Sequence, residues 1–180
     1  MAIAEKKLTV EEYLELEKTS EIRHEYVDGE LLAMAGEKRR HNNLIRQLVL
    51  VLTSVALQKG CELVFESVKL RTRTTRYRYP DLVVSCAPGD DEYFVDNPCF
   101  VVEVLSDSTA QTDITKKLEE YTRLPTLTRY IMVSQKSRFV TVCKRTNEGW
   151  TFETLDETGE FDLPCLEAKV TLEQLYQGIL

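Results

Sequence analysis

Apolar positions recur along the chain with two different periods, one typical of helices and one of strands. Between about residues 39 and 59, five apolar side chains return at helical spacing: Leu44, Leu48, Val51, Val55 and Leu57. Gly60 is placed to end this helix. Shorter helices are expected from the cap residue Thr9 to about Glu17 and over Leu172–Tyr176.

Strand-like segments fill much of the remaining chain. Asp28-Gly29 between two apolar runs predicts a hairpin over residues 24–34, and a second hairpin is expected around residues 147–149. Further strands are expected over four segments: Leu63–Leu70, Pro80–Cys86, Phe100–Leu105 and Tyr130–Val133.

The segment Phe100–Leu105 is almost continuously apolar, which is typical of a central strand covered on both faces. A helix is expected next, over about Thr112–Arg123, before the strand at Tyr130. A strand–helix–strand order favours a crossover with parallel pairing. The expected fold class is therefore α/β (or α+β), with a mixed central sheet flanked by helices, in one domain covering residues 1–180.

Charge and hydropathy limit the classes of function. The formal net charge of −7 means that bulk charge does not attract this chain to nucleic acid, so DNA binding would require a local basic surface. No apolar run reaches the roughly 20 residues that span a bilayer. The first seven residues contain no apolar signal core, so we expect a cytoplasmic protein with no membrane partner.

The five cysteines are scattered and form no CxxC pair: Cys61, Cys86, Cys99, Cys143 and Cys165. This pattern predicts reduced, mostly buried thiols in a cytoplasmic protein. Because the chain has only two histidines, we expect no zinc site.

The most unusual position is Glu103, a carboxylate inside an apolar strand. Burying a charge is costly unless it is paired or bound to a cation. One interpretation is a salt bridge to a core Arg or Lys. The other is a metal site shared with Asp81, at the start of another expected strand. Two such carboxylates suit Mg²⁺, which commonly uses one or two carboxylates plus water.

Three further residues are candidates for a role beside this pair. Lys117 falls on the expected helix after Glu103, on one face with Asp113 and Tyr121, and could hold water or offset charge; a solvated surface lysine is the alternative. His41 opens the long helix and could contact phosphate or support the site, although a structural role is also open. For Glu25, a strand or salt-bridge role is favoured over an extra acid.

One dense basic stretch, residues 69–78, leads directly to Asp81. It carries Lys69, Arg71, Arg73, Arg76 and Arg78. As a hairpin beside the site it could contact phosphates. Alternatively, it is a solvated edge hairpin whose charges prevent aggregation.

Several of these motifs together resemble the Uma2 family, described as restriction endonucleases. They are Tyr26–Glu30, His41, Tyr79–Val84, Asn97-Pro98, Val101–Ser106, Ser108–Ala110, Asp113, Lys117-Leu118 and Tyr121. The resemblance implies the PD-(D/E)xK nuclease fold with Mg²⁺ bound by the acidic pair. The superfamily lysine usually lies two residues after the second acid, where this chain has Leu105, so Lys117 would be its relocated counterpart.

The leading hypothesis is a DNA endonuclease that uses Mg²⁺ (or Mn²⁺). Asp81 and Glu103 would bind the metal with the backbone carbonyl of Val104, while Lys117 and His41 would complete the catalytic set. A homodimer is expected, because a two-fold axis presents two sites to antiparallel strands. The alternatives are an inactive nuclease-fold binding or regulatory module, and an enzyme acting on another phosphate ester.

Overall fold

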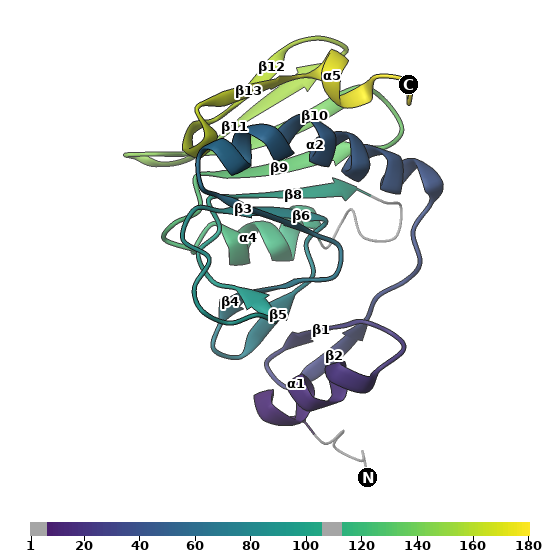
Figure 1. Ribbon diagram of the computed structural model, residues 1–180, viewed down its shortest axis with the longest axis vertical. Coiled ribbons are helices and arrows are strands. Elements are labelled where there is room, and N and C mark those ends of the chain that lie inside the picture. Colours follow the sequence, from purple (N-terminus) through teal and green to yellow (C-terminus); the bar gives the residue numbers. More distant parts are fainter. Residues whose placement is uncertain (1–6, 106–112) are drawn as a thin grey trace.

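A six-stranded mixed sheet forms the centre of the molecule in a computed structural model that describes residues 7–105 and 113–180 (Figure 1). The strand order is β11-β10-β9-β8-β6-β3. The bounds are Glu62–Phe65 (β3), Leu82–Ser85 (β6), Phe100–Leu105 (β8), Arg129–Ser134 (β9), Phe139–Thr146 (β10) and Gly149–Asp156 (β11). The β8–β9 pair is parallel and the other neighbours are antiparallel, so the predicted parallel crossover pairing is confirmed.

The central strands alternate their side chains between two apolar cores, which explains the continuous apolar run of β8. In β6 and β8, even-numbered residues such as Val84 and Val102 pack with α2 (Arg39–Gln58) and α5 (Leu172–Tyr176). Odd-numbered residues such as Val83 and Val101 pack with Tyr121 of α4 (Leu118–Tyr121). Figure 1 shows α2 lying across one face of this sheet. Among the described helices, none combines the length and hydropathy needed to span a bilayer.

A second sheet and a separate two-stranded pair complete the described architecture. The second sheet has the order β2-β1-β5-β4-β7. Its strands are His24–Val27 (β1), Glu30–Ala33 (β2), Lys69–Arg73 (β4), Arg76–Arg78 (β5) and Phe94–Val95 (β7), and α1 (Val10–Thr19) packs beside it. The pair consists of β12 (Glu160–Leu163) and β13 (Ala168–Thr171), joined by the 3₁₀ turn η2 (Pro164–Leu166).

Most predicted elements are confirmed, and one strand prediction is wrong. The long helix, the Asp28-Gly29 hairpin and the Thr9 capping box are present. The expected single strand Leu63–Leu70 is instead two strands in different sheets. Glu66 separates them with a φ of 57°, a left-handed conformation that breaks a strand.

The prediction of reduced thiols is wrong for four of the five cysteines. The structure pairs Cys61 with Cys86 and Cys99 with Cys165, and leaves Cys143 as a buried thiol. Cys61 and Cys86 come together because they immediately flank the paired ends of β3 and β6, where Glu62 lies opposite Ser85. The partners are 25 and 66 residues apart in sequence, so only the fold brings them together.

Candidate active site

Asp81 and Glu103 face each other across two neighbouring strands. The antiparallel register pairs Leu82 of β6 with Val102 of β8, so extending it by one residue places Asp81 opposite Glu103. Glu103 shares a face of β8 with Val101, whereas Asp81 lies just before the first residue of β6. The two acidic residues of the metal hypothesis are therefore neighbours across the β6–β8 pair.

Two groups hold the Asp81 carboxylate. Its Oδ2 accepts hydrogen bonds from the Val104 backbone N–H at 2.6 Å and from His41 Nε2 at 3.1 Å. Burial lowers the pKa of His41, but the hydrogen bond and negative charge of Asp81 outweigh this and raise it overall. His41 thus supports Asp81 from the first turn of α2. The role of the Val104 carbonyl as a metal ligand stays a prediction.

Glu103 is buried and accepts hydrogen bonds from the helical segment that follows it. Lys117 Nζ lies 3.0 Å from Glu103 Oε1, and Tyr121 Oη lies 2.9 Å from the same oxygen. Lys117 ends the π-helical turn η1 (Asp113–Lys117), and Tyr121 ends α4 one turn later. The predicted helix therefore brings Lys117 and Tyr121 to Glu103. The side chain of Asp113, and residues 106–112, lie outside the described part of the chain.

Lys117 also links the acidic pair to a buried ionic network. Its Nζ lies 3.3 Å from Glu25 Oε1, and Glu25 Oε2 accepts from Arg78 at 2.8 Å. Arg78 in turn donates to Glu120 at 2.7 Å. Glu25 therefore takes the salt-bridge role that its sequence context favoured. Burial and the facing carboxylates have opposite effects on Arg78, and its pKa is raised overall.

Glu120 is a network member that the sequence did not single out, and Arg78 was expected only as part of the basic stretch. Glu120 is 3% exposed. Burial raises its pKa, but hydrogen bonding to Arg78 and the charge of that guanidinium lower it below its ordinary value. The one available signal was the predicted helix, on which Glu120 follows Lys117 by three residues and therefore lies near the same face.

The predicted basic hairpin exists, but most of its charges are used within the protein. Arg71 pairs with Asp96, Arg76 with Asp28, and Arg78 with Glu120. Lys69 is buried, with its ammonium 5.5 Å from the centre of the Tyr79 ring. These charges are therefore largely balanced within the protein, and Arg73, Arg76 and Arg78 also line a hollow of about 330 Å³.

A separate basic surface lies beside the acidic pair. We call it the α2 basic surface; it consists of four exposed residues lining a hollow of about 490 Å³: Lys38, Arg39, Arg40 and Lys136. Arg40 donates to the Gln135 carbonyl, and the Gln135 side chain donates to the carbonyl of Leu105, two residues after Glu103. Positive charge is therefore concentrated locally on a protein whose formal net charge is −7.

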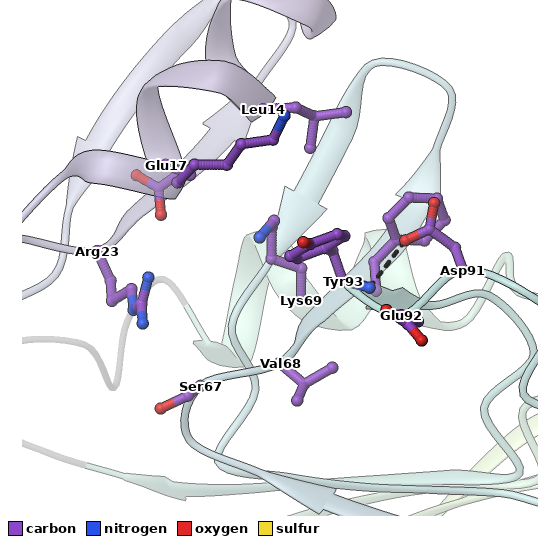
Figure 2. A pocket seen from close by; sticks show the side chains of 11 residues that line it. Leu14, Glu17, Arg23, Ser67, Val68, Lys69, Asp91, Glu92 and Tyr93 are labelled. Atoms are coloured by element: carbon purple, nitrogen blue, oxygen red, sulfur yellow. Dashed lines mark hydrogen bonds between the residues drawn. The ribbon is translucent and has the colours of Figure 1, made fainter.

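A pocket of about 430 Å³ opens between α1 and the β3–β4 turn (Figure 2). Figure 2 shows Arg23 and Lys69 among its lining residues, together with Ser67. Burial lowers the pKa of Lys69. The pocket is connected to the acidic site through Glu66, which precedes Ser67 and donates its N–H to the Asp81 carbonyl at 3.2 Å.

Comparison with known proteins places this fold and site in context. The model of the Uma2 family, described as "Putative restriction endonuclease", matches residues 10–173. A crystal structure described as a "putative nuclease belonging to DUF820" from Anabaena variabilis superposes with a TM-score of 0.77 at 19% identity, over 96% of this chain and 99% of that one. The predicted fold class, α/β (α+β) with a mixed central sheet flanked by helices, is confirmed.

This chain belongs to the Uma2 family. Two Synechocystis proteins are similar to it in sequence. "Uncharacterized protein slr1290" is 30% identical over 177 residues, covering 96% of this chain and 93% of that protein. "Uncharacterized protein sll1609" is 30% identical over 133 residues, covering 71% and 75%. The family resemblance expected from the sequence motifs is confirmed.

Proposed function

We propose that this protein is a metal-dependent endonuclease that hydrolyses phosphodiester bonds in DNA. The observation that carries the proposal is that Asp81 and Glu103 lie opposite each other across the β6–β8 pair, with the Asp81 carboxylate bonded to the backbone N–H that follows Glu103. Oxygen donors of this kind suit Mg²⁺ or Mn²⁺. When bound, the ion would supply a water of lowered pKa and stabilise charge on the phosphate.

The surrounding residues have separate roles in this proposal. Asp81 and Glu103 would hold the ion, with the Val104 carbonyl as a further ligand. His41 orients the Asp81 carboxylate through its hydrogen bond. Lys117, within 3.0 Å of Glu103, is placed to offset charge developing on the phosphate or to hold the attacking water. The α2 basic surface would bind the DNA backbone.

Cleavage of plasmid and single-stranded DNA with Mg²⁺ or Mn²⁺ tests the proposal. We expect Asp81→Ala and Glu103→Ala each to abolish cleavage. Asp162→Asn is the matched control, because Asp162 is also a partly buried carboxylate paired with a cation, Arg129, but lies on β12. Cleavage that survives both alanine substitutions would refute the assignment.

One alternative has support of its own: a nuclease fold that binds a partner without cleaving. Leu105 stands where the superfamily lysine is usual, and Lys117 already contacts Glu103 and Glu25. Titration calorimetry separates the two functions. Binding of Mg²⁺ or Mn²⁺ at millimolar concentration supports the endonuclease, and no binding supports the inactive module.

We also propose that the active form is a homodimer. Cutting two antiparallel strands is simplest with two sites related by a two-fold axis. Light scattering across a range of concentrations checks this proposal. A monomer at every concentration, with and without a DNA duplex, would contradict it.

A further inference from the structure

Four cysteines from four separate segments meet at one end of the central sheet. Cys61 follows α2, Cys86 follows β6, Cys99 precedes β8 and Cys165 lies in η2. The sulfur atoms of Cys86, Cys99 and Cys165 all lie within 4.8 Å of one another. Because Cys61 is bonded to Cys86, the two disulfides lie directly against each other.

We propose that, in the reduced protein, these four thiolates bind one Zn²⁺ as a closed tetrahedral site. A Zn–S distance of about 2.3 Å places tetrahedral sulfurs about 3.8 Å apart, so three sulfurs already lie near this spacing and Cys61, bonded to Cys86, would turn toward them once the disulfides open. A disulfide explains why two sulfurs meet. A single metal ion would explain why the two pairs lie against each other. No zinc was expected from two histidines, but a tetrathiolate site needs none.

The backbone geometry of one pair also favours a metal. The Cα atoms of Cys61 and Cys86 are 4.0 Å apart. Disulfides usually span about 4.4–6.8 Å between Cα atoms, so this separation is short for a covalent bridge. A metal imposes no such limit, because each sulfur bonds to the ion rather than to its neighbour.

The surroundings of the cluster suit a structural zinc site. Cys61 and Cys99 are 6% and 7% exposed and belong to the apolar core under α2, while Cys86 is exposed and gives the ion a way in. Lys59 pairs with Glu167, which joins the segment that carries Cys61 to the segment that carries Cys165. The site would fasten the β12–η2–β13 unit to the central sheet.

The cysteine cluster is distinct from the proposed nuclease site. Asp81 precedes β6 whereas Cys86 follows it, and Cys99 precedes β8 whereas Glu103 lies near its far end. The two sites are therefore at opposite ends of the same two strands. Sulfur donors select Zn²⁺, and the carboxylate pair selects Mg²⁺ or Mn²⁺, so the two sites separate by metal as well as by position.

Forming the site from the disulfide state requires a reductant. A phosphine attacks one sulfur of each disulfide and ends as a phosphine oxide with the oxygen of water. Each reaction transfers two electrons, breaks one S–S bond and leaves two thiols that carry the protons of that water. Zn²⁺ then displaces one proton from each of the four thiols.

The test is to purify the full chain in a phosphine reductant without chelator and to measure zinc by mass spectrometry. We expect about one Zn²⁺ per chain. Replacing zinc with Co²⁺ should give the visible bands of tetrahedral cobalt and sulfur-to-cobalt charge transfer in the near ultraviolet. Cys99→Ser and Cys165→Ser should each lose this spectrum.

Two control variants make the readout specific. Cys143→Ala removes a buried thiol outside the cluster, and Asp81→Asn alters the acidic pair; both should retain zinc and the cobalt spectrum. Alkylation first confirms that the four cluster thiols of the folded wild-type protein are reduced. The proposal fails if this protein binds no zinc, or if its cobalt form shows no charge transfer from thiolate sulfur. It also fails if both serine variants keep the spectrum. The wild-type measurement decides even if a serine variant does not fold.

Discussion

Glu120 shows how strongly a buried charge at this site depends on its partners. It accepts hydrogen bonds from Arg78 and Thr72, and Arg76 lies 3.4 Å away. Removing the carboxylate would leave the buried Arg78 guanidinium poorly compensated. We expect Glu120→Gln to lower the free energy of unfolding by about 3 kcal/mol at neutral pH. Chemical denaturation measures the loss.

The pH dependence of that loss follows from the lowered pKa of Glu120. Because the pKa of Glu120 is lower in the folded protein, its ionised carboxylate contributes full stability at pH values above its ordinary pKa of 4.5. That contribution is lost as the pH falls through the pKa of Glu120 in the folded protein. The difference between wild type and Glu120→Gln should therefore be full at neutral pH and shrink below pH 4.5. Glu119→Gln, at an exposed neighbour paired with Arg123, should cost little. Equal costs for the two variants would contradict this account.

Lys117 offers a test of catalysis separate from metal binding. Lys117→Met removes the ammonium beside Glu103 but keeps a long side chain. We expect DNA cleavage to fall by about 10² or more, because charge on the phosphate is no longer offset. Mg²⁺ binding by calorimetry should be no weaker, since the competing ammonium is gone.

Lys116 is the natural control, because it is adjacent to Lys117 but exposed. Lys116→Met should cleave DNA as wild type does. If Lys117→Met also cleaves normally, Lys117 has a purely structural role in the ionic network.

At the scale of elements, the β1–β2 hairpin depends on its two-residue turn. Gly29 has a φ of 101°, and a Cβ there would lie 2.8 Å from Lys7 Cβ. Gly29→Ala should lower the free energy of unfolding by more than about 1 kcal/mol, measured by denaturation.

Substitutions at two other glycines distinguish backbone strain from the steric clash with Lys7. Gly60 has a φ of 65° with open space around a Cβ, so Gly60→Ala reports backbone strain alone. Gly36 has neither a left-handed φ nor a close neighbour, so its substitution should be nearly neutral. A loss at Gly29 no larger than at Gly36 would refute the argument.

The elements also show what the sequence could reveal. Periodicity identified α2 and β8, because a long amphipathic helix and a continuous apolar strand leave clear patterns. It did not reveal β12 and β13, which are short and alternate with charged residues such as Glu160 and Lys169. The acidic pair was predictable from two carboxylates on strands, whereas the Glu25–Arg78 contact joins residues 53 apart and required the fold.

At the scale of the whole molecule, an acidic protein is proposed to bind a polyanion through one basic surface. Arg39→Ala with Lys136→Ala should weaken DNA binding and reduce the salt dependence of log K by about two, if each residue contacts one phosphate. Fluorescence anisotropy at several salt concentrations measures both quantities.

The matched control removes the same charge elsewhere. Lys144→Ala with Lys169→Ala deletes two cations of the C-terminal strands, which are paired with Glu153 and Glu160. This variant should bind DNA with an unchanged salt slope. If both double variants weaken binding equally, total charge rather than the α2 basic surface governs affinity.

The contact between Lys117 and Glu103 has a consequence for the protein when magnesium is scarce. Lys117 acts as a built-in counter-ion, so the acidic pair does not depend on an external cation to balance its charge. In its disulfide form, which holds no zinc, the chain should therefore keep its fold when depleted of divalent ions, and its melting temperature should change little on adding a chelator of Mg²⁺. Magnesium would then control catalytic activity and not folding, so the protein without Mg²⁺ would stay folded and regain activity when the ion is added.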